Sequence, residues 1–329
     1  MESRGKNKII VILGPTASGK SDMAIRLAQK FNGEIISADS RQIYRYANLT
    51  TGKITSAEQK RTKHWLIDIL NLNSYWSANQ FQKKAQKIIA DILNRGKLPI
   101  ICGGTGFWIK ALVDNVAFPE VKPNWKLRKK LGKYSVKKLF LMLKKLDARR
   151  AKSIDAQNKV RLIRAIEICK VLGSVPKLKI SPLPPTPSPA GRGWLEEPGE
   201  GVFQHNFLQI GLNIPKAKLH QNIQKRLKKR LELGMIKEVE NLHKKHGASW
   251  KRLENLGLEF RWIARFLQNK ISRQEMEAKL YFDIIHYAKR QMTWFSAQGR
   301  SASGGKKDTR IKWLKNYSQI EKLTKNFLK

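Results

Sequence analysis

Long apolar segments and paired cysteines are both missing from this sequence of 329 residues. No apolar run approaches the roughly 20 residues that a membrane-spanning helix needs. The two cysteines, Cys102 and Cys169, form no C-x-x-C pair, which excludes a zinc knuckle or a disulfide scaffold. The charged N-terminal residues show no signal-peptide pattern. We therefore expect a cytoplasmic protein that does not enter a membrane.

Acidic residues are scarce: 25 Asp and Glu stand against 66 Lys and Arg, for a formal net charge of +41. Residues 1–120 carry 18 basic and 9 acidic residues, whereas the remaining 209 carry 48 and 16. A field of this size favours a polyanionic partner. Nucleic acid is favoured over an anionic membrane because no basic amphipathic helix stands apart from core-like apolar spacing. The alternative is a solvated lysine-rich surface.

A complete phosphate-binding loop occupies residues 14–21, which read GPTASGKS and fit G-x-x-x-x-G-K-[ST] without a mismatch. An apolar run over 9–13 predicts a buried strand before it, and helical spacing over 21–30 predicts a helix after it. This context predicts that a phosphate ester or diphosphate binds here. Lys20 would reach the terminal phosphates, and the Ser21 hydroxyl would bind Mg²⁺. The residues of the loop are Gly14, Pro15, Thr16, Ala17, Ser18, Gly19, Lys20 and Ser21.

Alternating strand and helix patterns continue through the first third of the chain. Strands are expected at 34–38 and 98–102, with an amphipathic helix over 78–93 between them. This order predicts an α/β fold with a doubly wound parallel sheet, in which ligands bind beyond the carboxyl ends of the strands. Asp39 and Thr105 both follow such strand ends.

The rest of the sequence changes character several times. Half of the 12 prolines fall within 181–201, which cannot bury enough apolar surface to fold and is expected to be disordered. A returning core strand is expected at 207–212, followed by helical stretches over 216–245 and 273–295. The resulting segments are a phosphate-loop core (1–119), a helical insertion (120–180), a disordered loop (181–204), a return to the core (205–298) and a basic tail (299–329).

The expected site lacks the second acidic group that a nucleotide hydrolase uses for Mg²⁺, because the strand at 98–102 ends in Gly-Gly-Thr. Asp68 could supply that group or could simply cap a core strand. Asp39 could act as a general base toward an acceptor or could cap a helix. These features weaken the kinase and hydrolase hypotheses without excluding them.

Several motifs together resemble the tRNA dimethylallyltransferases, also called isopentenyl-tRNA transferases. The matching segments are Gly14–Ser21, Ile36–Tyr44 (with DSRQIY), Gly52–Lys53, His64–Asp68, Gly103–Gly106 (GGTG), Ile154–Asn158, Val160–Glu167, Arg226–Val239 and Tyr287–Trp294 (YAKRQMTW). They run in family order over nearly the whole chain. The phosphate loop alone is shared by many families, whereas the DSRQIY, GGTG and YAKRQMTW segments are specific.

The resemblance implies transfer of a dimethylallyl group from its diphosphate to N6 of the adenosine 3′ of certain tRNA anticodons. Asp39 would be the general base, Thr105 would hydrogen-bond near the reacting groups, and Arg226 would pair with the diphosphate beside Mg²⁺. The target base would have to leave its stack. The residues that would contact tRNA are Asp39, Ser40, Arg41, Gln42, Thr105, Arg128, Arg161 and Arg164, the last three on the helical insertion.

Two segments depart from the family pattern. Relatives usually carry Ile-Gly-Tyr-Lys-Glu where this chain has residues 256–260, and a methionine where it has Arg230. With two cysteines the chain cannot form the zinc finger of eukaryotic relatives, so it resembles the bacterial type. A small-molecule or nucleotide kinase is the alternative function, and an RNA-binding protein with an inactive loop is a third. We expect a monomer.

Overall fold

The computed structural model describes residues 7–177, 179–180, 205–296 and 309–329, and the chain divides into two compact units. The first unit contains the chain up to Asn115 together with 205–296 and 309–329, and the second contains Val116 to Ile180. The proline-rich segment 181–204, expected to be disordered, lies outside the described residues, as do residues 299–308 of the expected tail.

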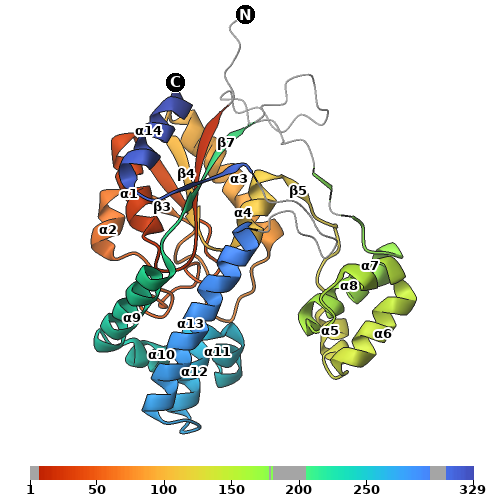
Figure 1. Ribbon diagram of the computed structural model, residues 1–329. Helices are drawn as coiled ribbons and strands as arrows, with labels where there is room; N and C mark the ends of the chain where they lie inside the picture. The colour runs from red at the N-terminus through yellow and green to blue at the C-terminus, as the bar shows by residue number, and fades with distance from the viewer. Residues whose placement is uncertain (1–6, 178, 181–204, 297–308) are drawn as a thin grey trace, which may run out of the picture. The chain divides into compact units, whose positions relative to one another are not determined.

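A six-stranded sheet forms the centre of the first unit, and every pairing in it is parallel (Figure 1). Its order is β3-β2-β4-β1-β7-β8. The strands are β1 (Lys8–Leu13), β2 (Gly33–Ser37), β3 (His64–Trp65), β4 (Leu98–Gly103), β7 (Asn206–Leu212) and β8 (Ile311–Leu314). In the central strand, Ile12 lies beside Cys102 of β4 and Ile210 of β7. The predicted α/β fold is confirmed.

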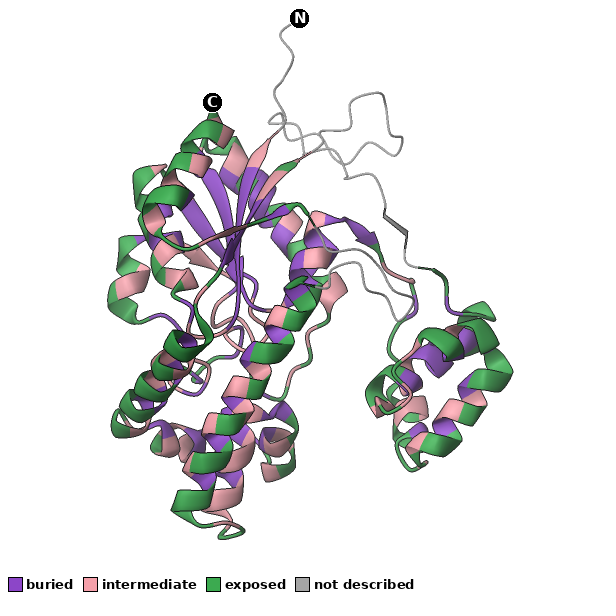
Figure 2. Ribbon diagram, viewed as in Figure 1, coloured by how far each residue is buried: buried purple, intermediate pink, exposed green. Residues whose placement is uncertain are grey.

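Apolar residues cover both faces of this sheet, as expected for a parallel sheet. Ile10 and Ile12 of β1 pack with α1 (Lys20–Lys30) and α14 (Tyr317–Leu328) on one face. Ile9, Val11 and Leu13 pack on the other face with α3 (Ala78–Asn94) and α4 (Gly106–Val113). Figure 2 shows the strands as a continuous buried layer between exposed helix surfaces. The sheet is thus doubly wound, with β1 near its middle.

Helices from the C-terminal half cluster at the end of the sheet where the strands finish (Figure 1). They are α9 (Lys216–Glu232), α10 (Met235–Lys244), α11 (Trp250–Leu256), α12 (Leu258–Leu267) and α13 (Arg273–Ser296). The helical stretch expected over 216–245 is broken at Gly234, whose φ of 95° is a left-handed conformation that favours glycine. A short helix, α2 (Ser56–Arg61), begins with a capping box between Thr55 and Glu58. The helices therefore surround the ends of β1, β2 and β4.

The segment expected to be a basic tail, 299–329, is folded in the part that the structure describes. Residues Ile311–Leu314 form the edge strand β8, paired with β7, and Tyr317–Leu328 form α14 on the sheet. Ile311 and Ile320 are buried there. Four residues are too short a run for periodicity to reveal, and surrounding lysines obscure the apolar positions of the helix.

The second unit is a helical insertion with its own small core. It comprises α5 (Trp125–Leu131), α6 (Val136–Leu146), α7 (Ala148–Ser153) and α8 (Lys159–Leu172), preceded by β5 (Val116–Ala117), which pairs with β6 (Lys179–Ile180). Leu139, Leu143, Leu162 and Ile166 are fully buried in it. Because β5 belongs to this unit, it begins at Val116 rather than at residue 120. In the described parts of both units, no helix is long and apolar enough to cross a membrane.

Candidate active site

The phosphate loop joins β1 to α1 in the predicted conformation. Gly14 and Gly19 have φ values of 148° and 85°, which side chains rarely adopt. Helix α1 begins at Lys20, and no side chain caps its start. Its first N–H groups and the positive end of its dipole therefore face the space beyond β1, an arrangement that suits an anion.

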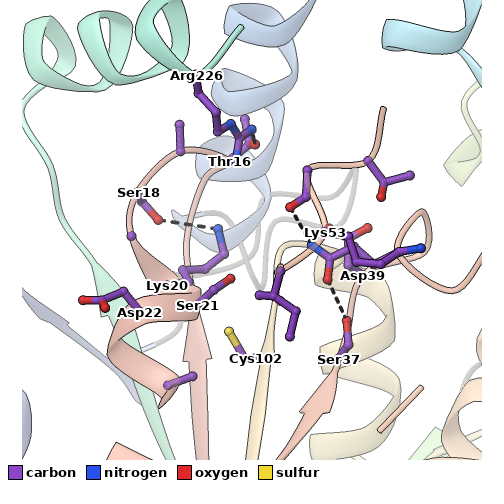
Figure 3. A pocket seen from close by; sticks show the side chains of 18 of the residues that line it. Thr16, Ser18, Lys20, Ser21, Asp22, Ser37, Asp39, Lys53, Cys102 and Arg226 are labelled. Atoms are coloured by element: carbon purple, nitrogen blue, oxygen red, sulfur yellow. Dashed lines mark hydrogen bonds between the residues drawn. The ribbon is translucent and has the colours of Figure 1, made fainter. Parts of the chain in front are cut away.

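A cavity of about 540 Å³ opens over this loop (Figure 3). Thr16 to Asp22 line it from one side, and Asp39, Gln42 and residues 51–54 line it from another. Helices α9 and α13 complete it with Arg226 and Gln291, among others. Its volume is in the range of small-molecule sites. The structure thus brings the loop and Asp39 together, as predicted.

Lys20 projects from the loop into this cavity (Figure 3), where its ammonium group donates to the carbonyl of Pro15 at 2.5 Å. Burial lowers its pKa to about 8, and Arg226 also lowers it. Cys102 lies nearby, but burial raises the pKa of its thiol to about 12, so it remains neutral. An anionic ligand would restore the full charge of Lys20.

Arg226 reaches the loop from α9, where its guanidinium donates to Thr16 Oγ1 (Figure 3). Asn222, one turn earlier, donates its amide to the carbonyl of Ala17 at 3.3 Å. Burial, with a smaller contribution from the neighbouring cation Arg230, lowers the pKa of Arg226 to about 10. Arg226 remains a cation at neutral pH and faces the cavity.

Asp39 follows β2 and lines the same cavity. One of its carboxylate oxygens accepts the Arg41 N–H at 2.8 Å, a local turn contact of the kind that capping residues make. Within the described residues, the other oxygen accepts no hydrogen bond. Both interpretations of Asp39 are therefore compatible: one oxygen orders the turn and the other is available to a ligand.

Thr105 and Ser40 fix the position of this turn. Thr105 Oγ1 accepts the Ser40 N–H at 3.0 Å, which ties the segment after β4 to the segment after β2. Gln42 is held by Ser37 Oγ and by the carbonyl of Gly52, each at 3.3 Å. Thr105 lines neither this cavity nor the smaller one beside it, and in this structure it acts on the turn that carries Asp39.

Arg41 differs from its neighbours because its guanidinium has no protein acceptor within the described parts of the chain. It lines a smaller adjoining cavity together with Asp39, Glu259 and Tyr287. Burial lowers its pKa, and burial raises the pKa of the Tyr287 hydroxyl. A partly buried cation without an acceptor indicates a ligand group, such as a phosphate or a base edge, at this position.

Gln291, on α13, is a site residue to which the sequence alone assigned no role. Its side-chain oxygen accepts the Thr16 N–H at 2.7 Å, and its side-chain nitrogen donates to the carbonyl of Gly104 at 3.0 Å. A Cβ at position 104 would lie 2.1 Å from that nitrogen, and one at Gly106 would lie 1.8 Å from Trp294. The GGTG and YAKRQMTW segments are therefore complementary in shape, which only their packing reveals.

The loop over residues 48–53 forms another wall, and α9 and α10 hold it in place. The carboxylate of Glu238 accepts the N–H groups of Asn48, Leu49 and Thr50 at 2.8–2.9 Å. Arg230 donates to the carbonyls of Leu49 and Thr50 from the same side. These contacts place Thr51 and Gly52 beside Arg226, so the C-terminal helices shape the cavity directly.

Two departures from the family pattern meet beside this loop. Arg230 and Glu259 form an ion pair at 2.9 Å, with side chains only 7% and 10% exposed. Arg230 also packs against Met235 and lies over Gly52. Each residue supplies the charge that the other needs when buried. The two substitutions are therefore one structural feature.

Asp68 does not face the phosphate loop. Its carboxylate accepts a hydrogen bond from the ammonium of Lys53, whose side chain is 1% exposed. Lys53 also donates to the carbonyl of Tyr44 and to Asn48, each at 2.9 Å. Asp68 thus neutralises a buried lysine. This role differs from the two considered from the sequence, a Mg²⁺ ligand and the cap of a core strand.

The arginines of the helical insertion have different surroundings. Arg128 and Arg164 both donate to the carboxylate of Glu167, which is 1% exposed, and Arg164 also donates to the carbonyl of Val121. They hold α5 to α8 and leave one net positive charge. Arg161 is exposed. Contact of the three with tRNA phosphates stays a prediction, and only Arg128 and Arg164 among them already pair with Glu167 in the described part of the chain.

Fold and cavity together define a phosphate-loop α/β protein that places a carboxylate and two cations around one small-molecule site. The family model described as IPP transferase matches residues 42–298, and the chain belongs to this family. It is 37% identical to a tRNA dimethylallyltransferase of Acetivibrio thermocellus over 326 residues, covering 97% of this chain and 96% of that protein. It is also 37% identical to one from Leuconostoc mesenteroides over 292 residues, covering 89% and 91%.

Solved structures agree with this assignment. A tRNA isopentenylpyrophosphate transferase of Staphylococcus epidermidis matches with a TM-score of 0.64 and 32% identity, covering 98% of this chain and 99% of that one. A full-length tRNA isopentenylpyrophosphate transferase from Bacillus halodurans matches with a TM-score of 0.66 and 27% identity, covering 98% and 96%. The resemblance read from the sequence is confirmed.

Proposed function

We infer that this chain transfers a dimethylallyl group from dimethylallyl diphosphate to N6 of the adenosine 3′ of the anticodon in tRNA, with release of diphosphate. The observation that carries this function is the single cavity that holds Lys20 and the available oxygen of Asp39. One end of the cavity suits a diphosphate, and the other offers a proton acceptor. The relatives are prenyl transferases, and such a reaction needs both a diphosphate site and a proton acceptor.

The reaction forms a bond between N6 and C1 of the dimethylallyl group and breaks the bond from C1 to the diphosphate oxygen. Lys20, Arg226 and the loop N–H groups would hold the diphosphate as negative charge accumulates on it. Asp39 would take the proton that leaves N6. Gln291 keeps the loop in register with the segment after β4. Lys20 and Arg226 would thus act on the leaving diphosphate, and Asp39 would act on the attacking amine.

A Mg²⁺ ion fits the loop through the Ser21 hydroxyl, which lines the cavity. The described residues contain no cluster of three or more His, Cys, Asp or Glu side chains that could hold a metal alone. Mg²⁺ is commonly bound by one or two protein ligands together with phosphates and water, so a single hydroxyl beside a diphosphate is a suitable donor set. The ion would supply positive charge to the leaving diphosphate.

Recognition of tRNA would depend on the turn after β2 and on the basic insertion. An adenine stacked in the anticodon loop must be extruded before it can reach Asp39. Arg41, whose guanidinium has no acceptor among the described residues, is placed to bind the extruded nucleotide or its phosphate. Arg161 and the other insertion arginines would contact the anticodon stem through its phosphates.

A phosphate-loop kinase is not favoured by the relatives, and a direct assay separates it from prenyl transfer. The protein is incubated with labelled dimethylallyl diphosphate, undermodified tRNA and Mg²⁺, and a parallel sample receives γ-labelled ATP. We expect prenyl label in the RNA and no transfer of phosphate. Phosphate transfer without prenyl transfer would establish the kinase, and tRNA binding without turnover would indicate an inactive RNA-binding protein.

A further inference from the structure

One face of α9 lies along the donor cavity. Asn222, Lys225, Arg226 and Lys229 all line the cavity, at positions i, i+3, i+4 and i+7 of the helix. This spacing places them on one stripe. The buried residues of the helix, Leu219, Ile223, Leu227 and Arg230, lie toward the protein interior. The stripe is therefore a wall of the cavity rather than an arbitrary part of a basic surface.

Lys225 and Lys229 differ from the two cations already assigned to the diphosphate. Lys20 and Arg226 already donate to protein oxygens, to the carbonyl of Pro15 and to Thr16 Oγ1. Lys225 and Lys229 are exposed, and within the described ranges neither forms an ion pair. Three carboxylates also line the cavity, those of Asp22, Asp39 and Glu58. The carboxylate of Glu58 accepts from Thr55 in a capping box.

We propose that Lys225 and Lys229 form a cationic rim that captures the diphosphate group of the donor and guides it to the phosphate loop. The identity of the donor rests on the function proposed above. Long flexible ammonium side chains act as point charges that can follow a moving phosphate. Charges lining a cleft concentrate an anionic ligand and raise its association rate. The rim would bind the diphosphate first, before the diphosphate reaches the N–H groups of the phosphate loop.

This role predicts an effect on phosphate binding that needs neither the prenyl chain nor tRNA. Inorganic diphosphate with Mg²⁺ is therefore the probe, and calorimetry on the full chain gives its Kd. The test variant is Lys225→Gln/Lys229→Gln. The matched control is Lys216→Gln/Lys228→Gln, which removes two exposed lysines from the same helix that do not line the cavity.

We expect the test variant to bind diphosphate about tenfold more weakly at low salt, because each exposed charge contributes modestly. The loss should shrink as salt is raised and the charges are screened. The control should bind within about twofold of the unchanged protein. Thermal unfolding of both variants should match, because all four lysines are exposed.

Equal binding by the two variants would overturn the proposal, as would a loss that does not depend on salt. A third result, an increase only in the KM for tRNA with diphosphate binding unchanged, would assign the two lysines to RNA phosphates and also overturn it. Failure of the unchanged protein to transfer a prenyl group would overturn the proposed function instead, because diphosphate binding is measured without turnover.

Discussion

The side-chain amide of Gln291 occupies the space that a side chain at position 104 would need, and it donates to the carbonyl of Gly104 at 3.0 Å. The same amide accepts the N–H of Thr16 in the phosphate loop. One buried side chain from α13 thus sets the phosphate loop against the segment that carries Thr105. The bottom of the cavity depends on residues 187 positions apart in the chain.

Gly104→Ala is expected to displace Gln291 and shift the phosphate loop. A misplacement of this kind can cost on the order of 100-fold in rate, so kcat/KM for the donor should fall by about that factor. Steady-state kinetics with varied dimethylallyl diphosphate measures the change. Gln274→Ala, at an exposed position near the start of α13, is the control and should leave the rate unchanged. A Gly104→Ala protein with full activity would contradict the role given to Gln291.

Asp39→Asn removes the proposed base and keeps the turn, since an amide oxygen can still accept the Arg41 N–H. Loss of a general base typically costs about 10²–10⁴ in rate, so kcat should fall within that range. The Kd for diphosphate should hardly change. Single-turnover transfer assays and calorimetry measure the two quantities. A parallel loss of diphosphate binding would make Asp39 a Mg²⁺ or structural residue instead.

The charge of Lys20 predicts a pH dependence of donor binding. Burial lowers its pKa to about 8, so the ammonium loses its proton as the pH rises through that value. Donor affinity should be level below pH 8 and decline above it. Lys20→Arg, whose guanidinium stays charged, should bind with a level profile over the same range. A decline in Lys20→Arg that matches the unchanged protein would place the titrating group elsewhere.

The buried pair of Arg230 and Glu259 predicts coupled effects on stability. Arg230→Met leaves the Glu259 carboxylate buried without a partner, which should lower the free energy of unfolding by about 3–5 kcal/mol. Adding Glu259→Gln should restore much of the loss, because the uncompensated charge is gone. Urea denaturation measures all three proteins. As a control, Lys237→Ala breaks a surface pair with Glu240 and should cost less than about 1 kcal/mol. Additive effects of the two changes would contradict the coupling.

Short sequence patterns predicted the strands, helices and loops that are determined by residues close together in the chain. The strands β1, β2 and β4, the phosphate loop and the placement of Asp39 follow from apolar runs and from the glycine motif. Parallel strands finish at one edge of the sheet, so residues after them had to meet. The second unit likewise followed from helical spacing.

The features that the sequence did not reveal depend on contacts between distant segments. Gln291 acquires its role only when α13 packs against Gly104, and Asp68 is neutralised by a lysine 15 residues away. Arg230 and Glu259 departed from the family pattern separately, and their pairing appears only in space. Strand β8 is stabilised by β7 rather than by its own four residues.

Identification of the modified nucleoside tests the central claim most directly. Undermodified tRNA is incubated with the protein, labelled dimethylallyl diphosphate and Mg²⁺, and the RNA is then digested to nucleosides and analysed by mass spectrometry. The account predicts label on N6 of one adenosine, 3′ of the anticodon, with almost none when Asp39→Asn replaces the unchanged protein. Label on another nucleoside, or full labelling by Asp39→Asn, would contradict it.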